Sequence, residues 1–356
     1  MMHLTTKNAN VKKVLTGALL STVFFLGFLS FTQAQEAQQG VDVTISPVFL
    51  DLRVEPGVSI SDKIKIRNNT RGDLSLTATV KKLVSKDEKI DVLEPSALDE
   101  YISWVKFENP EIVIKPGEWG NINFTLDVPS DAAFGYYYMV TFKKTQSPDV
   151  QDGQTALSGE VGVPLLVAVV KDGAVSSAQL LDFKPKNNIN EYLPVEFVAT
   201  LRNTGNVHIR PRGNIFIKKE SGGKDIGIIE VNSENGRILP DSQRSFETGW
   251  KDGFFVREPV TENGEVRLDK NGNPVTKLTF NLNKLTSFRF GKYSAEMKLV
   301  FDGGNKDVLI EGVTTFWVIP YTLIAIILGV LIIGFVLFKF VLGAYIKKQI
   351  NNSKVQ

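Results

Sequence analysis

The apolar run at residues 321–338, YTLIAIILGVLIIGFVLF, constrains the fold of this chain more than any other feature. It holds no charged residue, and a helix can continue to Tyr345 if Lys339 extends its amine toward the membrane surface. At about 1.5 Å of rise per residue, such a helix covers a hydrocarbon core of roughly 30 Å. The lysines of the tail fit the positive-inside rule. We therefore expect a transmembrane helix at residues 319–345, a short cytoplasmic tail at 346–356 and a single-pass type I protein of the cell membrane.

A second apolar run, at residues 14–31, lies close to the N-terminus. Three lysines precede it, and Thr32-Gln33-Ala34 follows it with small residues at the positions that a signal peptidase prefers. We expect a signal peptide at residues 1–34 that is cleaved after Ala34. The alternative is an uncleaved anchor, and both interpretations place the middle of the chain outside the cytoplasm.

The two ends of the chain hold seven of its 41 basic residues and none of its 39 acidic ones. The segment between the apolar runs therefore has 34 basic and 39 acidic residues and a formal charge of −5. Proteins that bind nucleic acid rely on an excess of Lys and Arg to neutralise phosphates. We expect no nucleic-acid partner.

Between the apolar runs, the pattern is that of β-strands. Short segments rich in β-branched and aromatic residues are bounded by Gly, Pro, Asn or Asp; they occupy residues 41–54, 59–69, 74–84, 121–128, 136–144, 161–170, 195–203, 214–220, 225–231, 277–283, 293–301 and 308–318. Turn sequences such as Ser221-Gly222-Gly223 and Gly303-Gly304 separate neighbouring segments, as hairpin loops do. Many strands without intervening helices favour β-sandwiches over a parallel sheet.

The sequence also contains an internal repeat. IRNNTRG at residues 66–72 matches LRNTGN at 201–206, and two further pairs follow in the same order: 113–126 with 237–250, and 134–142 with 290–301. Two diverged copies of one domain explain this order. We expect an all-β fold with two tandem immunoglobulin-like sandwiches, at residues 41–172 and 173–316, plus the C-terminal helix. The second copy has an insertion near 251–280, which we interpret as a protruding hairpin.

His208 lies in the stretch LRNTGNVHIRPRG together with three arginines. The residues Asn203 to Asn206 tolerate turn conformations, and beyond them Val207 and Ile209 alternate with His208 and Arg210. Alternation predicts that the apolar pair faces the core and the polar pair faces solvent. We interpret the stretch as a turn and a solvated strand edge, with an anion or ligand site as the alternative.

The catalytic inventory favours a binding protein over an enzyme. The chain has no cysteine, and His208 is its only histidine after signal cleavage, so thiol chemistry and a site of several histidines are excluded. It has no GxSxG, P-loop or GxGxxG motif, and we expect no catalytic residue, metal or cofactor. A pair of catalytic carboxylates stays open. The sequence around Asp269 lacks the glycine and glutamate of a calcium loop, and we expect a type I′ hairpin at Asn271-Gly272 instead.

Three consecutive tyrosines, Tyr136, Tyr137 and Tyr138, are the candidate ligand-binding residues. Consecutive residues of a strand point to opposite sides, so at least one ring must face outward, where it could stack on a sugar. The alternative is core packing and cross-strand pairing. Trp104 and Trp119 present the same two possibilities.

The order of elements resembles the WxL-interacting protein family of bacterial cell-surface proteins. The resemblance rests on a PG turn, an Asn after the second strand and a G-x-Y strand in SPVFLDLRVEPG, IRNNT, IKPGEWGNINFTLDVP and FGYYYMVTF, and on the ending of the second domain in one membrane helix. The insertion near 251–280 is atypical of that family. The resemblance implies peptidoglycan binding by the first domain and contact with WxL proteins or host ligands by the second. We expect partners among cell-wall polysaccharides or surface proteins. The alternatives are an assembly or secretion component that donates a strand to an exported client and, third, a hydrolase.

Overall fold

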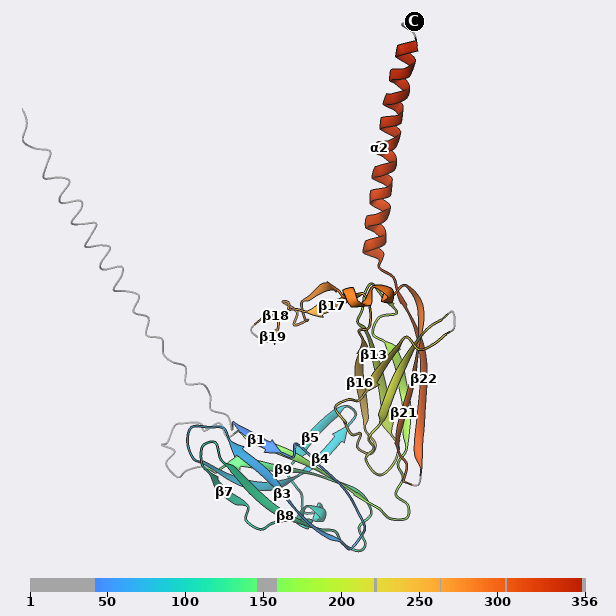
Figure 1. The fold of residues 1–356 in the computed structure, drawn as a ribbon. Helices are drawn as coiled ribbons and strands as arrows, with labels where there is room; N and C mark the ends of the chain where they lie inside the picture. Colours follow the sequence, from blue (N-terminus) through green and yellow to red (C-terminus); the bar gives the residue numbers. More distant parts are fainter. Residues whose placement is uncertain (1–41, 146–158, 221–222, 263, 305, 354–356) are drawn as a thin grey trace, which may run out of the picture.

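The computed structural model describes residues 42–145, 159–220, 223–262, 264–304 and 306–353, and the expected signal peptide lies outside them. Two β-sandwiches are followed by one helix at the C-terminus (Figure 1). The predicted fold class is confirmed. The last strand of the first sandwich ends at Val169, and the first strand of the second begins at Ala178.

The two sandwiches have the same strand order. In the first, one sheet runs β1 (Val43–Ser46), β3 (Ser59–Asn68), β8 (Trp119–Asp127) and β6 (Val105–Phe107), and the other runs β2 (Leu50–Val54), β10 (Glu160–Val169), β9 (Phe134–Lys144), β4 (Leu74–Lys86) and β5 (Lys89–Leu93), with β7 (Glu111–Ile114) also pairing with β4. In the second, one sheet runs β11 (Ala178–Pro185), β13 (Val195–Asn203) and β16 (Gln243–Trp250). The other runs β12 (Ile189–Asn190), β22 (Asp307–Val318), β21 (Gly291–Asp302), β14 (Arg212–Lys219) and β15 (Gly227–Val231). Apart from β6 and β7, each strand of the first domain has a counterpart in the second.

Alternation along the strands forms each core. In β3, Ile64 and Ile66 are buried while Lys63 and Lys65 point outward, because side chains of a strand alternate between its faces. The first core is closed by residues such as Phe124, and the second by Trp250 with its aromatic neighbours. A short 3₁₀ helix, η1 (Glu100–Trp104), precedes β6.

One buried asparagine occupies the same place in each copy of the repeat. The Asn68 amide donates to the carbonyl oxygens of Gly72 and Ile114, each at 2.8 Å. The Asn203 amide donates to those of Val207 and Ile238, also at 2.8 Å. Both side chains are fully buried, and each satisfies carbonyl groups that would otherwise lack a partner inside the protein. The internal repeat is therefore structural as well as a matter of sequence.

Two local predictions differ from the structure. The segment 41–54 is two strands in different sheets, β1 and β2, because the chain crosses from one sheet to the other at Pro47, which cannot donate to a ladder. The type I′ turn at Asn271-Gly272 is wrong: the turn closes from Gly272 N–H to the Asp269 carbonyl, and only Gly272 of the pair has a positive φ, +81°. The Asp269 carboxylate accepts from the N–H groups of Asn271 and Asn273 and holds this turn instead.

The insertion in the second domain is a hairpin that projects sideways near the base of the helix (Figure 1). Its outer pair is β17 (Phe255–Pro259) with β20 (Thr276–Phe280), and its inner pair is β18 (Thr261–Glu262) with β19 (Glu265–Val266). The 3₁₀ segment η2 (Leu282–Ser287) follows β20, so the strand expected over 277–283 ends at Phe280.

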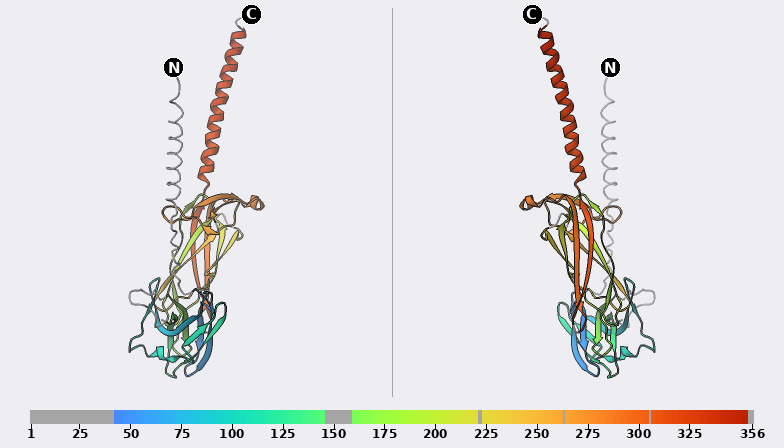
Figure 2. Two further views of the ribbon diagram at one scale, coloured as in Figure 1. Left: turned by 90° about the vertical axis from the view of Figure 1, so that its left-hand side faces the viewer. Right: turned by 90° about the vertical axis from the view of Figure 1, so that its right-hand side faces the viewer.

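The C-terminal helix α2 (Tyr321–Ser353) leaves the end of the second sandwich that lies opposite the first sandwich (Figure 2). Its segment Tyr321–Ile346 has 26 residues, a mean hydropathy of 2.9 and no contact that buries it against the sandwiches. The helix is long and apolar enough to cross a membrane.

The buried asparagines give a stability prediction. Asn203→Ala should lower the free energy of unfolding by at least about 2 kcal/mol, because it leaves two buried carbonyl groups without a donor. Asn109→Ala, at an exposed turn position, is the control and should stay within about 0.5 kcal/mol. Denaturant unfolding of the full chain in detergent measures both, and equal effects would contradict the assignment.

Candidate functional sites at the domain junction and on the first sandwich

The stretch 201–213 lies at the junction of the two domains and holds the linker between them. The Asn206 side chain donates to the Gly173 carbonyl at 2.8 Å and accepts from the Val175 N–H at 2.7 Å. The backbone N–H of Asn206 donates in turn to the Val175 carbonyl. Gly205 packs so closely on the linker that a Cβ there would stand 2.1 Å from the Val175 oxygen. Glycine is required at this close approach.

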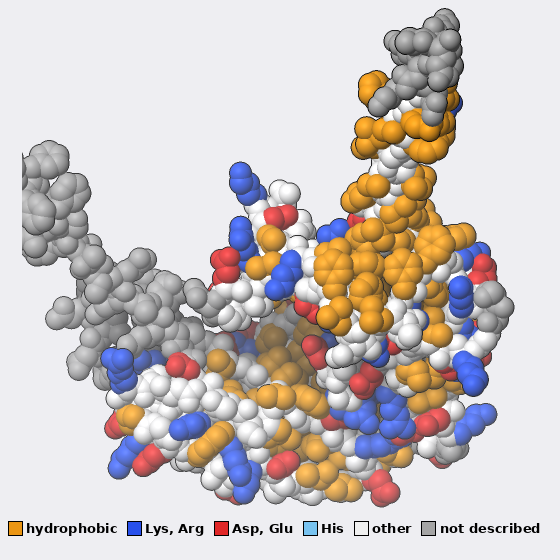
Figure 3. Space-filling view, turned by 45° about the horizontal axis from the view of Figure 1, so that its top comes forward, with side chains coloured by type: hydrophobic (Ala, Val, Ile, Leu, Met, Phe, Trp, Pro, Cys, Tyr) orange, Lys and Arg blue, Asp and Glu red, His pale blue; other side chains and the backbone are white. Residues whose placement is uncertain are grey.

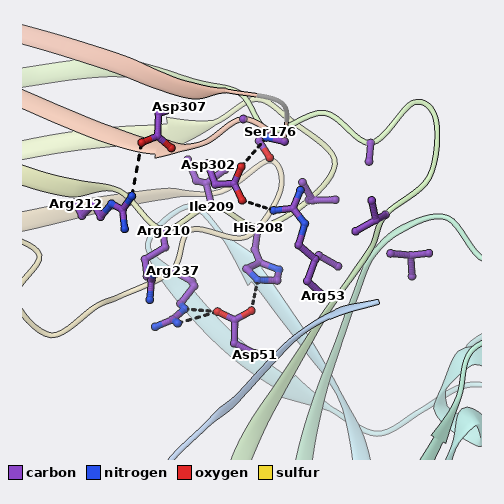
Figure 4. Close-up of a pocket in the computed structure, with 17 residues that line it drawn as sticks. Asp51, Arg53, Ser176, His208, Ile209, Arg210, Arg212, Arg237, Asp302 and Asp307 are labelled. Carbon is purple, nitrogen blue, oxygen red and sulfur yellow. Dashed lines mark hydrogen bonds and ion pairs between the residues drawn. The ribbon is translucent and has the colours of Figure 1, made fainter. Parts of the chain in front are cut away.

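His208 forms part of a charged cluster between the domains (Figure 4). Its Nε2 lies 2.9 Å from Asp51 Oδ1, and Arg237 donates to Asp51 Oδ2 at 2.8 Å. The interpretation of His208 as a solvated edge residue is therefore wrong: its side chain is 7% exposed. Val207 and Ile209 do face the core and Arg210 is exposed, as predicted. His208 points outward from its own domain, but the first domain covers it.

The two basic partners set the ionisation of Asp51. Burial by itself would raise its pKa, but the hydrogen bonds and charges of His208 and Arg237 outweigh that cost and lower the pKa to about 2. Asp51 is consequently a carboxylate at any ordinary pH. A folded pKa below the unfolded one means that this contribution to stability is complete above about pH 4 and is lost as the pH falls toward 2.

An apolar contact adjoins the charged cluster. Leu239 of the second domain packs with Leu83 and Leu166 of the first, beside Tyr137 and Met139. Leu239 occupies the repeat position that Lys115 has in the first domain, where the side chain is exposed. The second copy has thus exchanged a charged residue for an apolar one at the contact.

Two polar contacts extend the junction to its margins. The turn between β4 and β5 reaches the edge of β16, where Gln243 N–H donates to the Asp87 carbonyl at 3.1 Å and the Ser245 hydroxyl donates to Glu88. On the other side, Arg53 pairs with Asp302. These contacts, the linker and the charged cluster fix the angle between the sandwiches.

A cavity of about 520 Å³ lies within this junction. Most of its charges are used by the chain itself, since Arg53, Arg237 and Arg212 face Asp302, Asp51 and Asp307 respectively (Figure 4). Charged groups that satisfy one another have little left to offer a ligand. The cavity is better explained as part of the joint than as a binding site.

The three candidate tyrosines lie in three different environments. Tyr138 is fully buried in the first core. Tyr136 is partly buried and packs against Trp104, with ring centroids 4.5 Å apart. Tyr137 packs edge-on to His208 at 5.7 Å, so the second domain covers it. All three rings pack against other parts of the chain. The predicted role of these tyrosines in ligand binding stays a prediction.

The outer face of the β1-β3-β8-β6 sheet is an exposed polar surface of the first sandwich. The other sheet of this sandwich contacts the second domain through Leu83 and Leu166, so this face lies on the opposite side of the first sandwich from that contact. We call it the distal face. Its central side chains, by strand register, are Ser46 of β1; Lys63, Lys65 and Arg67 of β3; and Trp119, Asn121 and Asn123 of β8.

The cations of the distal face lack acidic partners. Lys106, at the margin, pairs with Asp127 at 2.9 Å. For Lys63, Lys65 and Arg67, the described part of the chain offers no carboxylate within ion-pair distance. Sequence reasoning did not select these three residues, although the alternation in KIKIR was the signal that places them on one face.

Trp119 stands beside these cations. It is directly opposite Arg67 in the register and is 50% exposed. With Ser46, Lys63, Lys65 and Asn121 it lines a hollow of about 460 Å³. An exposed indole next to unpaired cations and amides offers an apolar ring, charge and hydrogen-bond donors on one surface.

No family model and no curated protein matches the chain. Among solved structures, the class 5 fimbriae chaperone CfaA overlaps with a TM-score of 0.37 and 14% identity, over 77% of this chain and 99% of that one. The Escherichia coli chaperone DraB gives 0.33 and 13%, over 78% and 97%. The Pseudomonas aeruginosa CupB2 chaperone gives 0.33 and 10%, over 77% and 100%. These overlaps are too weak to carry a function to this chain.

The junction gives a second stability prediction. His208→Ala should lower the free energy of unfolding of the full chain by about 1–2 kcal/mol, because it removes one partner of a half-buried carboxylate. Arg210→Ala, two residues away and exposed, should change it by no more than about 0.5 kcal/mol. Denaturant unfolding in detergent compares the two variants. A His208→Ala protein as stable as Arg210→Ala would restore the solvated interpretation.

Proposed function

We propose that this protein is a membrane-anchored, extracytoplasmic binding protein that holds an anionic cell-wall polymer against its distal face. The observation that carries the proposal is a group of three cations without a described carboxylate partner, Lys63, Lys65 and Arg67, beside the exposed ring of Trp119; Arg67 Nε donates only to the Gly117 carbonyl, at 3.2 Å. The segment between the apolar runs is acidic as a whole, so a local cluster of unpaired cations needs a reason. A ligand with carboxylate or phosphate groups supplies one.

The position of the face supports the same function. Helix α2 would anchor the chain, and the second sandwich would act as a spacer between the membrane and the first. The first sandwich, which carries the distal face, would then be the part of the chain farther from the membrane (Figure 2). The resemblance to WxL-interacting proteins, which implies wall binding by the first domain, agrees with this proposal.

The ligand class follows from the side chains. Lysine and arginine make charge-assisted hydrogen bonds to carboxylates and phosphates. Asn121 and Asn123 offer amide donors and acceptors that suit hydroxyl groups, although Asn123 already donates to Glu108 at 2.8 Å. The Trp119 ring suits the apolar C–H face of a sugar. A polysaccharide that carries anionic groups combines all three features.

The test is co-sedimentation of the full-length protein in detergent with isolated cell walls, before and after chemical removal of their anionic polymers. We expect Trp119→Ala, and the triple change Lys63→Ser, Lys65→Ser, Arg67→Ser, each to weaken binding at least about tenfold, which corresponds to about 1.4 kcal/mol. Raising the salt concentration should weaken binding by the unchanged protein, because exposed charges are screened.

The matched control is Lys89→Ser, Lys143→Ser, Lys144→Ser, which removes the same charge from other exposed positions of the first domain. It should bind as the unchanged protein does. Equal losses in both triple variants would show a general charge effect and contradict the site. Binding that survives in the distal-face variants but fails in Tyr136→Ala or Tyr137→Ala would return the site to the tyrosines.

A second function, the addition of a client strand, is favoured by one observation. Strand β2 pairs with β10 only over Leu165 to Val169, while β9 pairs with all of β10. The Val170 N–H donates to the Val54 carbonyl at the end of β2. The backbone N–H and C=O groups of every second residue along β10 therefore point to the same side as those of Val170. In the part of the chain that the structure describes, no strand pairs with Glu160 and Gly162 on that side. An extended client segment could pair there, although Pro164 offers no donor.

Crosslinking in cells tests this second function. A photoreactive residue at Gly162 should give a protein adduct if a client strand pairs there, and one at exposed Lys115 should not. Glu160→Pro should abolish the adduct, because it removes an outward N–H, whereas Glu160→Gln should keep it. No adduct at Gly162, or one that persists in Glu160→Pro, would eliminate strand addition at this edge.

A further inference from the structure

The membrane-proximal end of the second sandwich exposes a group of large apolar side chains. Leu282 is 70% exposed and Leu285 63%; Phe280, Phe288 and Phe290 are each between 45% and 59% exposed. We call these five residues the collar. Figure 3 shows hydrophobic side chains gathered where the helix leaves the sandwich, continuous with those of the helix itself. Soluble surfaces seldom expose so many large apolar residues together, and such a patch marks a contact.

The collar belongs to a defined structure. Phe255 packs edge-on against Phe280 and Phe288, with ring centroids 5.3 and 5.6 Å apart. The η2 segment is tied back to the sandwich by Lys284 and Arg289, which both pair with Asp252. The exposed rings and leucines therefore rest on a supporting layer and keep their positions.

The collar is also fixed in place beside the helix. Glu191 accepts from the Thr322 hydroxyl in the first turn of α2 and pairs with Arg257 of β17 at 3.0 Å. Ile319 N–H donates to the Asn190 carbonyl. Only Ile319 and Pro320 separate β22 from α2. The root of the hairpin and the first turn of the helix are held together.

We infer that the collar lies in the outer interface of the membrane and is a second, peripheral contact of the ectodomain with lipid. This inference rests on the proposed anchoring by α2. A surface joined to the first turn of a membrane-spanning helix lies at the level of the lipid headgroups. Leucine and phenylalanine side chains at that depth are buried among acyl chains, while Trp317 and Tyr321 suit the interface at the base of the helix.

The charge of the insertion agrees with a lipid surface. Residues 251–290 hold seven basic and five acidic residues, in an ectodomain that is otherwise acidic. Basic residues close to a membrane are attracted by anionic headgroups. The hairpin extends sideways from the base of the helix, roughly at a right angle to the helix axis (Figure 1). It would therefore lie along the membrane surface.

The absence of cysteine allows a direct test. Single cysteines at Leu285 and Phe288 in the full-length protein are labelled with an environment-sensitive fluorophore and reconstituted into vesicles of phosphatidylethanolamine and phosphatidylglycerol. We expect both probes to be quenched by lipid-borne quenchers and to be several-fold less accessible to a water-soluble quencher than a probe at Leu309. Leu309 is the matched control, because it is 55% exposed on β22 away from the collar.

A probe at Ile333, in the middle of the apolar span, separates this inference from the anchor on which it rests. If Ile333 is lipid-exposed while Leu285 and Phe288 behave like Leu309, the collar contact is overturned and the anchor stands. If Ile333 also reports water, the anchor fails and the collar contact falls with it. Energy transfer between copies at Leu285, with protection that disappears on dilution in lipid, would show a second copy as the occupant and overturn the lipid assignment.

Discussion

The contact of Leu239 and its neighbours with the outer surface of the β2-β10-β9-β4-β5 sheet determines how the rest of the molecule is used. A sandwich has two outer faces, and this contact lies on one of them in the first domain. At the same junction, the charged cluster around Asp51 and the linker held by Asn206 fix the angle between the sandwiches. Among the residues that the structure describes, the distal face lies on the sheet that takes no part in this contact. The position of the proposed binding surface is thus a consequence of how the two domains pack.

Local patterns predicted the parts of this fold that depend on local physics. Alternation of apolar and polar residues gave most of the strands, and the repeated Arg-Asn ending gave the two related domains. The same alternation placed His208 on an outward surface, and it does point out of its own sandwich. Periodicity cannot say that another domain covers that surface, because the contact lies 157 residues away in the sequence. The same limit applies to the apolar segment 161–170. Its sequence makes Leu166 look like one more core residue, but Leu166 packs against Leu239 of the other domain.

The candidate sites show a similar division. Lys63, Lys65 and Arg67 could have been placed on one face from their spacing of two. Their lack of carboxylate partners could not be predicted from the sequence, because it depends on which strands lie next to β3. The tyrosines attracted interest because they are aromatic and consecutive, whereas their surroundings, a core, an aromatic cluster and a domain contact, appear only in the folded chain. Phe280 and Leu282 of the collar fit a strand-like alternation in 277–283, but the alternation does not show that they lie beside α2, which only the folded chain reveals.

The short connection between β22 and α2 also has a mechanical consequence. In the proposed arrangement, tension between the ligand and the membrane would enter the second sandwich near Ala178 at the junction and leave it through Val318 at the opposite end. That pull acts along the strands, so the twelve residue pairs between β21 and β22 would resist it together in shear. Peeling would instead break the ladder one pair at a time. In that arrangement, the second sandwich would pass tension on to α2 without first unravelling its last strand.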